Sequence, residues 1–417
     1  MLLKEVKLMK KTEVAVIGGG PAGMMAAGTA STRGLKVILL EKNKRPGKKL
    51  ALTGKGRCNL TNAAPLEEFF DQIPVNSRFL YSALYSFSNE RLIDFFHGLG
   101  LKTRVERGNR VFPTSGQAKD VVSALVKHLR KQGVKIITEQ PVTNINKEKN
   151  KFIITTRKEK YLADICVLAT GGMAYPETGS EGDGYIFARR LGHNIISPQP
   201  SLVPLEVEEE WVKQTDNLNL KNITLTLFAD NKNIFSGFGE MKFTPYGISG
   251  PLVLSASSHI SNPQDKNYRL SLDLKPALTK EQLDTRIQRD FKKFSRKLYR
   301  NSLDNLLPIK LIPVIIKLSQ IPSGKPVHQI TKKERKKLLK LLKELTLHVQ
   351  SYRSYAEAII TSGGIDVTEI YPGTMESRIV DNLYFAGEII DTDAYTGGFN
   401  LQIAFSTGYL AGINLEI

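Results

Sequence analysis

The chain has 417 residues, too many for one ordinary hydrophobic core, so we expect two or three domains. No run of about 18 apolar residues occurs, and a membrane span is therefore not expected. Lys and Arg (59) outnumber Asp and Glu (41), and the net charge of +18 favours a polyanionic partner, RNA or an anionic membrane surface, unless it reflects a basic proteome or solubility alone.

The first elements predict a dinucleotide site. An apolar strand at 14–17 leads into three spaced glycines, and a helix follows over 24–33. Such glycines allow a tight turn and let the backbone approach a pyrophosphate at the helix N-terminus. A second strand ends at Glu41, whose carboxylate can bind both hydroxyls of an adenosine ribose but would repel the 2′-phosphate of NADP. The nucleotide is therefore FAD or NAD.

The next 130 residues predict the remainder of an α/β domain. Residues 42–62 are rich in Gly, Lys and Asn and predict a long ordered loop. Apolar residues at helical spacing follow over 79–96, and a second amphipathic helix is expected at 117–131. Short strands are predicted at 134–137, 142–146, 152–156 and 161–168, the last ending in Ala169-Thr170-Gly171-Gly172. We read this as a Rossmann-like sheet with an added β-meander.

From about residue 193 the pattern changes. Segments rich in β-formers at 202–207, 223–229, 234–243 and 268–274 predict an inserted antiparallel β domain. Residues 279–347 then become helical and strongly basic. We expect a discontinuous nucleotide-binding domain at 1–192 and 351–417, the β domain at 193–276, and a basic helical domain at 277–350.

Two C-terminal signals favour FAD over NAD. A strand reaches Gly387-Glu388, and Thr396-Gly397-Gly398-Phe399-Asn400 opens a final helix that runs through Ala411. An NAD-binding domain has no need of these turns, whereas the ribityl chain and flavin ring of the longer FAD can use them. Partial positive charge at the helix N-terminus would favour a reduced, anionic flavin.

Several long motifs resemble the BaiN/YhiN-type flavoproteins: residues 47–62 (GKKLALTGKGRCNLTN), 169–183, 239–251, 374–378 and 396–408. The resemblance implies a glutathione-reductase-like FAD-binding Rossmann fold of the α/β class, with an inserted antiparallel β-barrel and a small basic helical domain. The family loop usually reads GGGRCN, and Lys55 replaces its middle glycine. Motifs and resemblance together assign FAD to Gly18, Gly20, Pro21, Ala22, Gly23, Glu41, Lys42, Lys49, Leu50, Gly56, Arg57, Cys58, Asn59, Val142, Thr170, Gly171, Gly387, Glu388, Gly398, Phe399, Asn400 and Leu401.

Members of this family resemble a 23S rRNA dihydrouridine synthase, an aminoacetone oxidase and a reductase of unsaturated bile-acid intermediates, so the fold does not select the substrate. Charge favours RNA. Two basic amphipathic helices, predicted at 286–300 and 331–344, can bind phosphates, with solvated faces or a peripheral membrane helix as alternatives. The RNA-binding candidates are Arg286, Arg289, Lys292, Lys293, Arg296, Lys297, Lys332, Lys333, Lys336 and Lys337.

We expect an FAD-dependent reductase that makes dihydrouridine in 23S rRNA, free or in an assembling large ribosomal subunit. A hydride would pass from flavin N5 to uracil C6, and a proton would be added at C5. The candidate proton donors are Cys58, Tyr175 and Tyr246, although Cys58 is equally a candidate for packing, and the two tyrosines are also candidates for stacking on a base or for packing. Arg57 is a candidate for the flavin or for a substrate phosphate. No second complete fingerprint occurs, so NADH or NADPH would bind only transiently as the reductant.

Two rival functions stay open. One is a small-molecule oxidase or enone reductase, and the other is a non-catalytic RNA-binding factor with structural FAD. The only two cysteines, Cys58 and Cys166, form no CxxC motif, and residues 1–11 show no export signal, so we expect a cytoplasmic protein without stable membrane association. The six histidines show no metal-ligand spacing, and no metal is expected.

Overall fold

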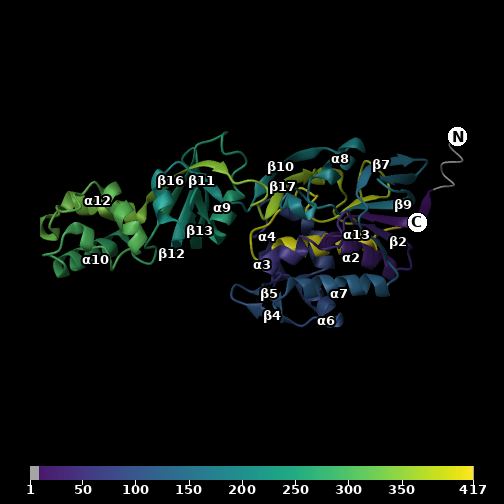
Figure 1. Cartoon of the computed structure of the whole chain (residues 1–417), viewed down its shortest axis with the longest axis horizontal. Helices are drawn as coiled ribbons and strands as arrows, with labels where there is room; N and C mark the ends of the chain where they lie inside the picture. Colours follow the sequence, from purple (N-terminus) through teal and green to yellow (C-terminus); the bar gives the residue numbers. More distant parts are fainter. Residues whose placement is uncertain (1–8, 417) are drawn as a thin grey trace. The chain divides into compact units, whose positions relative to one another are not determined.

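The computed structural model describes residues 9–416, which form two compact units (Figure 1). We call the first the Rossmann unit: it contains the chain up to Ser201 and again from Tyr355. The second, the inserted unit, is Leu202–Ser354. The prediction about an export signal concerned residues 1–11, and residues 1–8 of this segment lie outside the described residues.

A mixed sheet forms the centre of the Rossmann unit. Its parallel strands lie in the order β6-β2-β1-β9, and β18 pairs with the C-terminal half of β9. Antiparallel β8 pairs with the N-terminal half of β9, and β7 follows, which is the predicted meander. Residues 14–17 are almost fully buried, as expected for a parallel strand covered on both faces. The bounds are β1 Lys10–Ile17, β2 Val37–Leu40, β6 Lys135–Ile137, β7 Val142–Glu148, β8 Lys151–Thr156, β9 Lys160–Leu168 and β18 Leu383–Phe385.

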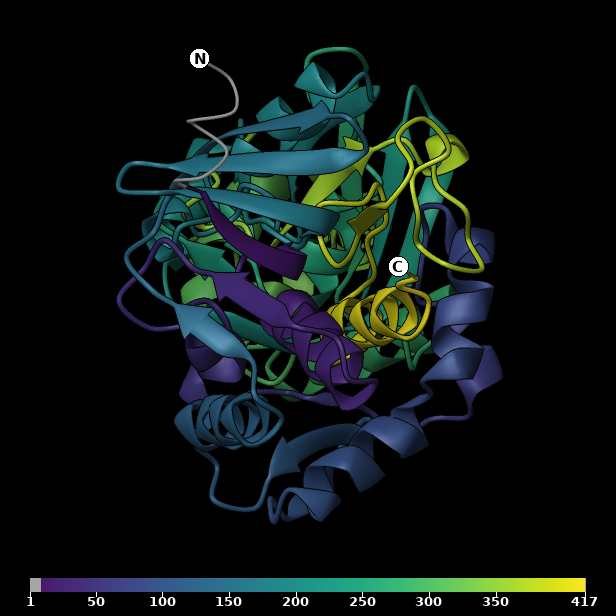
Figure 2. The same ribbon diagram turned by 90° about the vertical axis from the view of Figure 1, so that its right-hand side faces the viewer.

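Helices α2 (Pro21–Thr32) and α13 (Phe399–Ile413) lie side by side, purple and yellow in Figure 2, although they come from opposite ends of the chain. A Cβ at Gly408 would lie 2.3 Å from the Ala22 carbonyl oxygen, so this close approach requires glycine. Helix α7 (Ala118–Lys131) packs on α2, as its apolar face predicts. The other elements here are α4 Leu66–Phe70, α5 Tyr81–Ser86, α6 Asn89–Gly98, α8 Asp183–Arg190, β3 Thr61–Asn62, β4 Thr103–Glu106, β5 Arg110–Pro113, β10 Ile195–Ser201 and β17 Ile360–Ile365.

Two details of the Rossmann unit differ from our expectations. The segment 42–62 is not only loop, because it contains a 3-10 turn, η1 (Leu50–Leu52), and a short turn, α3 (Thr53–Gly56). The chain also leaves this unit later than residue 193, because β10 pairs with β17 over Ile195–Ser201. The β propensity of β10 resembles that of the insertion, and only the pairing partner assigns it to the Rossmann unit.

The inserted unit contains a closed six-stranded antiparallel barrel in the order β11-β14-β13-β12-β15-β16. Burial alternates along β12, where Ile223, Leu225 and Leu227 point inward. We expected residues 279–347 to be helical, but strand β16 begins at Leu345. The barrel is therefore not confined to 193–276. The bounds are β11 Leu205–Val207, β12 Asn219–Ala229, β13 Lys232–Thr244, β14 Gly247–Ser249, β15 Tyr268–Asp273 and β16 Leu345–Tyr352, with α9 at Pro251–Ser257.

Between β15 and β16 lie the basic helices α10 (Lys280–Lys293) and α12 (Lys332–Lys343), with α11 (Ile312–Ser319) between them in sequence. Our expected helix at 286–300 is wrong at both ends. A capping box of Thr279 and Gln282 starts α10 earlier, and after Lys293 the chain turns. The helix expected at 331–344 is confirmed, and Thr331 caps it in the same way. Within residues 9–416, no helix is long and apolar enough to cross a membrane.

Candidate functional site

Four of the predicted cofactor segments follow the carboxyl ends of neighbouring parallel strands. Gly18–Gly20 follow β1, Glu41 follows β2, residues 169–172 follow β9, and Gly387-Glu388 follow β18. Because parallel strands end at the same edge of a sheet, these segments converge there. This edge is where open α/β sheets bind their ligands.

The glycine turn at the start of α2 is closed on one side and open on the other. A Cβ at Gly23 would lie 1.9 Å from the Gly18 carbonyl oxygen, whereas a Cβ at Gly20 would meet nothing within 4 Å. Gly20 is the N-cap and supplies no side chain to the free amide groups of α2, where Pro21 and Ala22 begin the helix. Open space beside a helix N-terminus without a side-chain cap fits a pyrophosphate.

Glu41 is buried, and its carboxylate is held from two sides. Its Oε2 accepts a hydrogen bond from the Gly19 amide at 2.9 Å, and Oε1 accepts bonds from the backbone and side chain of Asn43 at 2.7 and 2.8 Å. A carboxylate has about four acceptor positions, which leaves one for a ribose hydroxyl. Lys42 does not contact Glu41 in this network, because its ammonium group pairs with Glu181 and Asp183, each at 2.7 Å.

Lys49 and Glu388, two cofactor candidates 339 residues apart, form an ion pair. The ammonium nitrogen lies 2.7 and 3.0 Å from the two carboxylate oxygens, and the Thr361 amide donates to the same carboxylate at 3.0 Å. The Lys49 ammonium also lies 6.0 Å from the centre of the Tyr175 ring. This pair fastens the 42–62 segment to the end of β18, while neighbouring Leu50 is buried in the core.

The loop that carries the RCN motif has an unusual backbone. Gly54, Lys55, Gly56 and Cys58 all have positive φ, between 58° and 81°. Cys58 is fully buried, and this burial raises the pKa of its thiol to about 12 despite a hydrogen bond with Thr53. The thiol therefore keeps its proton at neutral pH and is a weak acid there, so the structure favours the packing alternative for Cys58.

The N-terminus of α13 is ordered by its own side chains. Gly398 is the N-cap with φ 106°, and Phe399 packs edge-to-face on Phe69 at 4.9 Å. The Asn400 side chain accepts from the Ala394 amide at 2.9 Å and donates to its carbonyl at 2.6 Å. Asn400 thus holds the preceding loop by its side chain, and the first-turn amides of α13, up to Leu401, remain for a ligand.

Five buried side-chain atoms of the Rossmann unit have no hydrogen-bond partner among the described residues. Such atoms are rare in proteins, and an absent ligand is one standard explanation. Two belong to predicted cofactor residues. Gln140, which we did not predict, donates its amide to the Glu41 carbonyl at 3.0 Å, two positions before Val142. The five atoms are Asn59 Oδ1, Gln140 Oε1, Thr170 Oγ1, Thr392 Oγ1 and Asp393 Oδ1. The residues present therefore fit FAD along this edge.

Asp393 is a buried acid that sequence reasoning missed. Asp393 is only 1% exposed, and its Oδ2 accepts a hydrogen bond from the Ser201 hydroxyl at 3.0 Å. Burial raises the pKa of Asp393 to about 6, and the nearby charges of Asp391 and Glu388 add to the increase. The only available signal was its place five residues after Glu388, because acids in such a loop usually point to solvent.

The two tyrosine candidates belong to different units. Tyr175 is half-buried in the Rossmann unit, and burial raises the pKa of its phenol, so that the hydroxyl stays protonated at neutral pH. Tyr246 lies in the inserted unit, where the Arg353 guanidinium stacks 4.0 Å from the ring centre.

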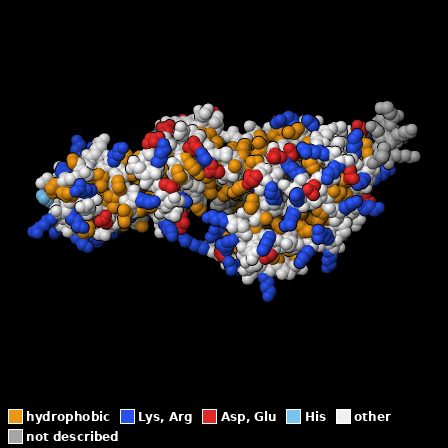
Figure 3. Space-filling view, viewed as in Figure 1, with side chains coloured by type: hydrophobic (Ala, Val, Ile, Leu, Met, Phe, Trp, Pro, Cys, Tyr) orange, Lys and Arg blue, Asp and Glu red, His pale blue; other side chains and the backbone are white. Residues whose placement is uncertain are grey.

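The basic candidates of α10, α12 and the turn after α10 are exposed, with one exception. Arg286 is half-buried, because it pairs with Asp290 at 2.9 Å. The two helices contact each other, and Arg335 of α12 pairs with Asp284 of α10 at 2.8 Å. Figure 3 shows Lys and Arg side chains on the surface of this helical part. The exposed candidates are Arg289, Lys292, Lys293, Arg296, Lys297, Lys332, Lys333, Lys336 and Lys337.

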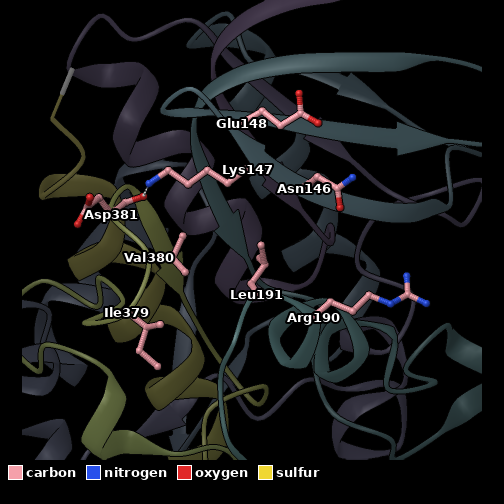
Figure 4. Close-up of a pocket in the computed structure, with 8 residues that line it drawn as sticks. All are labelled: Asn146, Lys147, Glu148, Arg190, Leu191, Ile379, Val380 and Asp381. Carbon is pink, nitrogen blue, oxygen red and sulfur yellow. Dashed lines mark hydrogen bonds between the residues drawn. The ribbon is translucent and has the colours of Figure 1, made fainter.

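No group of three or more His, Cys, Asp or Glu side chains within residues 9–416 is arranged to hold a metal ion. A shallow cavity of about 500 Å³ lies elsewhere in the Rossmann unit, between β7, the end of α8 and residues 379–381 (Figure 4). Lys147 crosses it and donates to the Asp381 carbonyl at 2.7 Å. None of the predicted cofactor residues lines this cavity.

Comparisons with known proteins agree with this geometry. The family model described as HI0933-like protein Rossmann domain matches residues 12–414. The chain is 33% identical over 403 residues to a 3-dehydro-bile acid delta(4,6)-reductase of Clostridium scindens, covering 96% of this chain and 98% of the relative. It is 28% identical over 407 residues to a ribosomal RNA dihydrouridine synthase of Escherichia coli, covering 98% of each.

Among solved structures, a 3-ketosteroid delta1-dehydrogenase from Sterolibacterium denitrificans is similar with a TM-score of 0.52 and 12% identity, covering 98% of this chain and 99% of that chain. This likeness concerns the fold alone. The family match and the 33% identical relative extend over nearly the whole chain. The chain therefore belongs to the HI0933-like family, FAD-dependent oxidoreductases with a Rossmann domain.

Proposed function

We propose that this protein is a cytoplasmic FAD-dependent reductase that forms dihydrouridine in 23S rRNA, with NADH or NADPH as the transient reductant. The observation that carries the proposal is the exposed basic surface of α10 and α12 in the inserted unit. Lys and Arg contacts to phosphates give affinity and position for RNA without reading its sequence. Two relatives described as ribosomal RNA dihydrouridine synthases, 28% identical over nearly the whole chain, support it.

In this proposal the glycine turn of α2, Glu41, the Lys49–Glu388 pair and the N-terminus of α13 hold FAD. Bound FAD would supply two electrons to the uracil ring as a hydride. The chain itself must orient the base and deliver one proton to it. We assign that proton to the Tyr175 hydroxyl, because this side chain is only half-buried and its ring centre lies 6.0 Å from the Lys49 ammonium, whereas the thiol of Cys58 is fully buried in the core.

A second candidate is a reductase of a small unsaturated ketone. The observation that favours it is the 33% identity to a protein described as a 3-dehydro-bile acid delta(4,6)-reductase. Uracil and an unsaturated ketone share one chemical feature, a carbon–carbon double bond conjugated to a carbonyl group. The same FAD site can therefore serve either substrate, and the basic helices would then have no role in binding.

The test is mass-spectrometric measurement of dihydrouridine in 23S rRNA from cells with and without the gene. The deletion strain is complemented with the wild type or with a variant reversing Lys292, Lys293, Lys336 and Lys337 to Glu. A matched control reverses four other exposed lysines of the inserted unit, Lys213, Lys221, Lys232 and Lys266. We expect dihydrouridine to disappear on deletion and to return with the wild type and the control only.

Unchanged dihydrouridine after deletion would refute the rRNA proposal. The ketone candidate is then tested on purified protein, by following NADH- or NADPH-dependent loss of the enone absorbance of an unsaturated 3-ketosteroid. The Gly20→Ala change is aimed at FAD binding. If this variant still complements the rRNA phenotype of the deletion strain, the protein would instead be a non-catalytic RNA-binding factor.

A further inference from the structure

The second basic surface of this chain lies in the Rossmann unit, away from the helices that we singled out in the sequence. Strands β4 and β5 form an antiparallel hairpin in which Arg104 pairs with Phe112 and Glu106 with Arg110. Directly paired residues point to the same face of a hairpin, so these four side chains share one face. Figure 3 shows Lys and Arg side chains gathered over this part of the Rossmann unit.

A third arginine joins this face from the RCN loop. The Arg57 guanidinium lies 4.2 Å from the centre of the Phe112 ring and also forms an ion pair with Glu106. Arg104 pairs with the same carboxylate at 3.0 Å, and Arg110 lies 5.9 Å from the Phe112 ring. Glu106 thus holds two of the guanidinium groups, and the third, that of Arg110, donates to the Arg107 carbonyl at 3.0 Å. We call Arg57, Arg104 and Arg110 the arginine platform.

The charge around the platform is strongly unbalanced. Lys55, Lys102 and Arg107 are exposed on the adjoining loop and hairpin, and Glu106 is the one acid within 102–110. The two ion pairs of Glu106 neutralise a single positive charge, so a net charge of +5 remains over six basic residues and one acid.

This arrangement matches the needs of RNA more closely than those of a small metabolite. Guanidinium groups bind phosphates through paired N–H donors and stack on bases with their planar faces. Guanidinium groups that are already held by Glu106, by the Phe112 ring or by the Arg107 carbonyl lose less conformational freedom when they bind. The platform also begins in the RCN loop, beside Cys58 and Asn59, so a strand bound there would run next to the segment assigned to the flavin.

We propose that the arginine platform binds the phosphate backbone of the RNA substrate next to the flavin site. This inference rests on the proposed function and adds a second RNA contact, in a different unit from α10 and α12. It also gives Arg57 a role toward the substrate rather than toward the flavin.

The test is binding of a 23S rRNA transcript by FAD-loaded protein at a series of salt concentrations. The variant is Arg104→Gln with Arg110→Gln. The matched control, Lys127→Gln with Arg130→Gln, removes the same charge from exposed positions on α7 of the same unit. Flavin absorbance is measured for each protein to show that the FAD site is intact.

We expect the platform variant to bind about tenfold more weakly at 0.15 M salt, with a log–log salt slope smaller by about 1 to 2, since each lost phosphate contact lowers it by about 0.7 to 0.9. The control should change affinity less than about twofold, because its charges are not at the contact. Equal losses in both variants would overturn the platform and leave only general electrostatics.

The outcomes also separate this inference from the proposed function. A wild-type protein that binds the transcript and restores dihydrouridine, together with a platform variant that does both equally well, overturns the platform alone. A wild-type protein that neither binds the transcript nor affects dihydrouridine overturns both. A wild-type protein that binds vesicles of anionic phospholipid but not the transcript, together with a platform variant that has lost vesicle binding, would assign the platform to a membrane surface instead.

Discussion

The two units of this protein treat their buried polar atoms differently. Within residues 9–416, five buried side-chain atoms without partners lie in the Rossmann unit and one, Thr244 Oγ1, lies in the inserted unit. The barrel instead has an apolar interior, and the adjoining helices place their charges outside. The Rossmann unit thus has more buried polar atoms that a bound group could satisfy, whereas the helices of the inserted unit expose their charges.

This contrast suggests that cofactor binding and substrate choice depend on different surfaces of the protein. We expect the sheet edge of the Rossmann unit to bind the cofactor, and the family as a whole does not select one substrate by its fold. The exposed basic residues of the inserted unit can change without disturbing a core. Substrate choice is therefore expected to depend on surfaces such as α10, α12 and the arginine platform rather than on the glycine turns.

The largest expected effect comes from the glycine turn of α2. Gly23→Ala places a Cβ 1.9 Å from the Gly18 carbonyl oxygen, so we expect loss of FAD and of the folded Rossmann unit. Gly20→Ala has open space, so it should leave the apoprotein as stable as the wild type but weaken FAD binding about tenfold or more. Thermal unfolding with and without added FAD measures both. Equal damage from the two variants would contradict the proposed position of the pyrophosphate.

The next effect isolates the inserted unit. Leu225 is fully buried in the barrel, and Leu225→Ala should lower its free energy of unfolding by about 2–5 kcal/mol. Hydrogen exchange of the barrel amides measures the loss, and the flavin absorbance spectrum reports on the Rossmann unit. We expect faster exchange with an unchanged spectrum. Simultaneous loss of bound flavin would show that the two units unfold as one.

Asp393 predicts a pH dependence that belongs to the Rossmann unit. Burial raises its pKa from 3.8 to about 6. The folded protein therefore holds a proton that the unfolded chain has already released between these values. Stability from this group is complete below about pH 4 and is lost as the pH rises through 6, by about 3 kcal/mol.

Asp393→Asn removes this titration, and it should be more stable than the wild type at pH 7.5 but not at pH 4. Urea unfolding of the apoprotein at several pH values measures the difference. Ser201→Ala removes the hydroxyl that bonds to Asp393 without removing the acid, so it should keep the pH dependence. Parallel stability curves for the wild type and Asp393→Asn would exclude a raised pKa.

The smallest effect concerns the RCN loop. Lys55 has a φ of 58°, a conformation that costs most residues about 1–2 kcal/mol, while glycine adopts it freely but loses about 0.5–1 kcal/mol more entropy on folding. Lys55→Gly should therefore raise the free energy of unfolding by about 0.5–1 kcal/mol. Lys44→Gly, at an exposed position outside the positive φ region, should lower it. Chemical denaturation of both variants provides the comparison.

The parts that sequence reasoning predicted correctly are those whose signals are local. The strand, glycines, helix and acid from Val14 to Glu41 follow one another without interruption, and the structure has β1, α2 and β2 there. The end of the Rossmann unit could not be placed, because Ile195–Ser201 is a strand in either reading and only its pairing with β17 assigns it. The start of strand β16 was also not predicted, because it follows the basic helix α12 directly and no turn signal separates the two.

By itself, the sequence determined the nucleotide fold, the FAD fingerprint, the excess of positive charge and the family resemblance, because each depends on spacing or composition. Only the tertiary structure decided which distant residues meet. Lys49 reaches Glu388, Asn59 and Gln140 acquire buried atoms without partners, and Arg57 joins Arg104 and Arg110 around Glu106. The burial, the pKa values and the ion pairs of these side chains depend on residues far apart in the chain. No local sequence pattern shows which distant residues will lie close together.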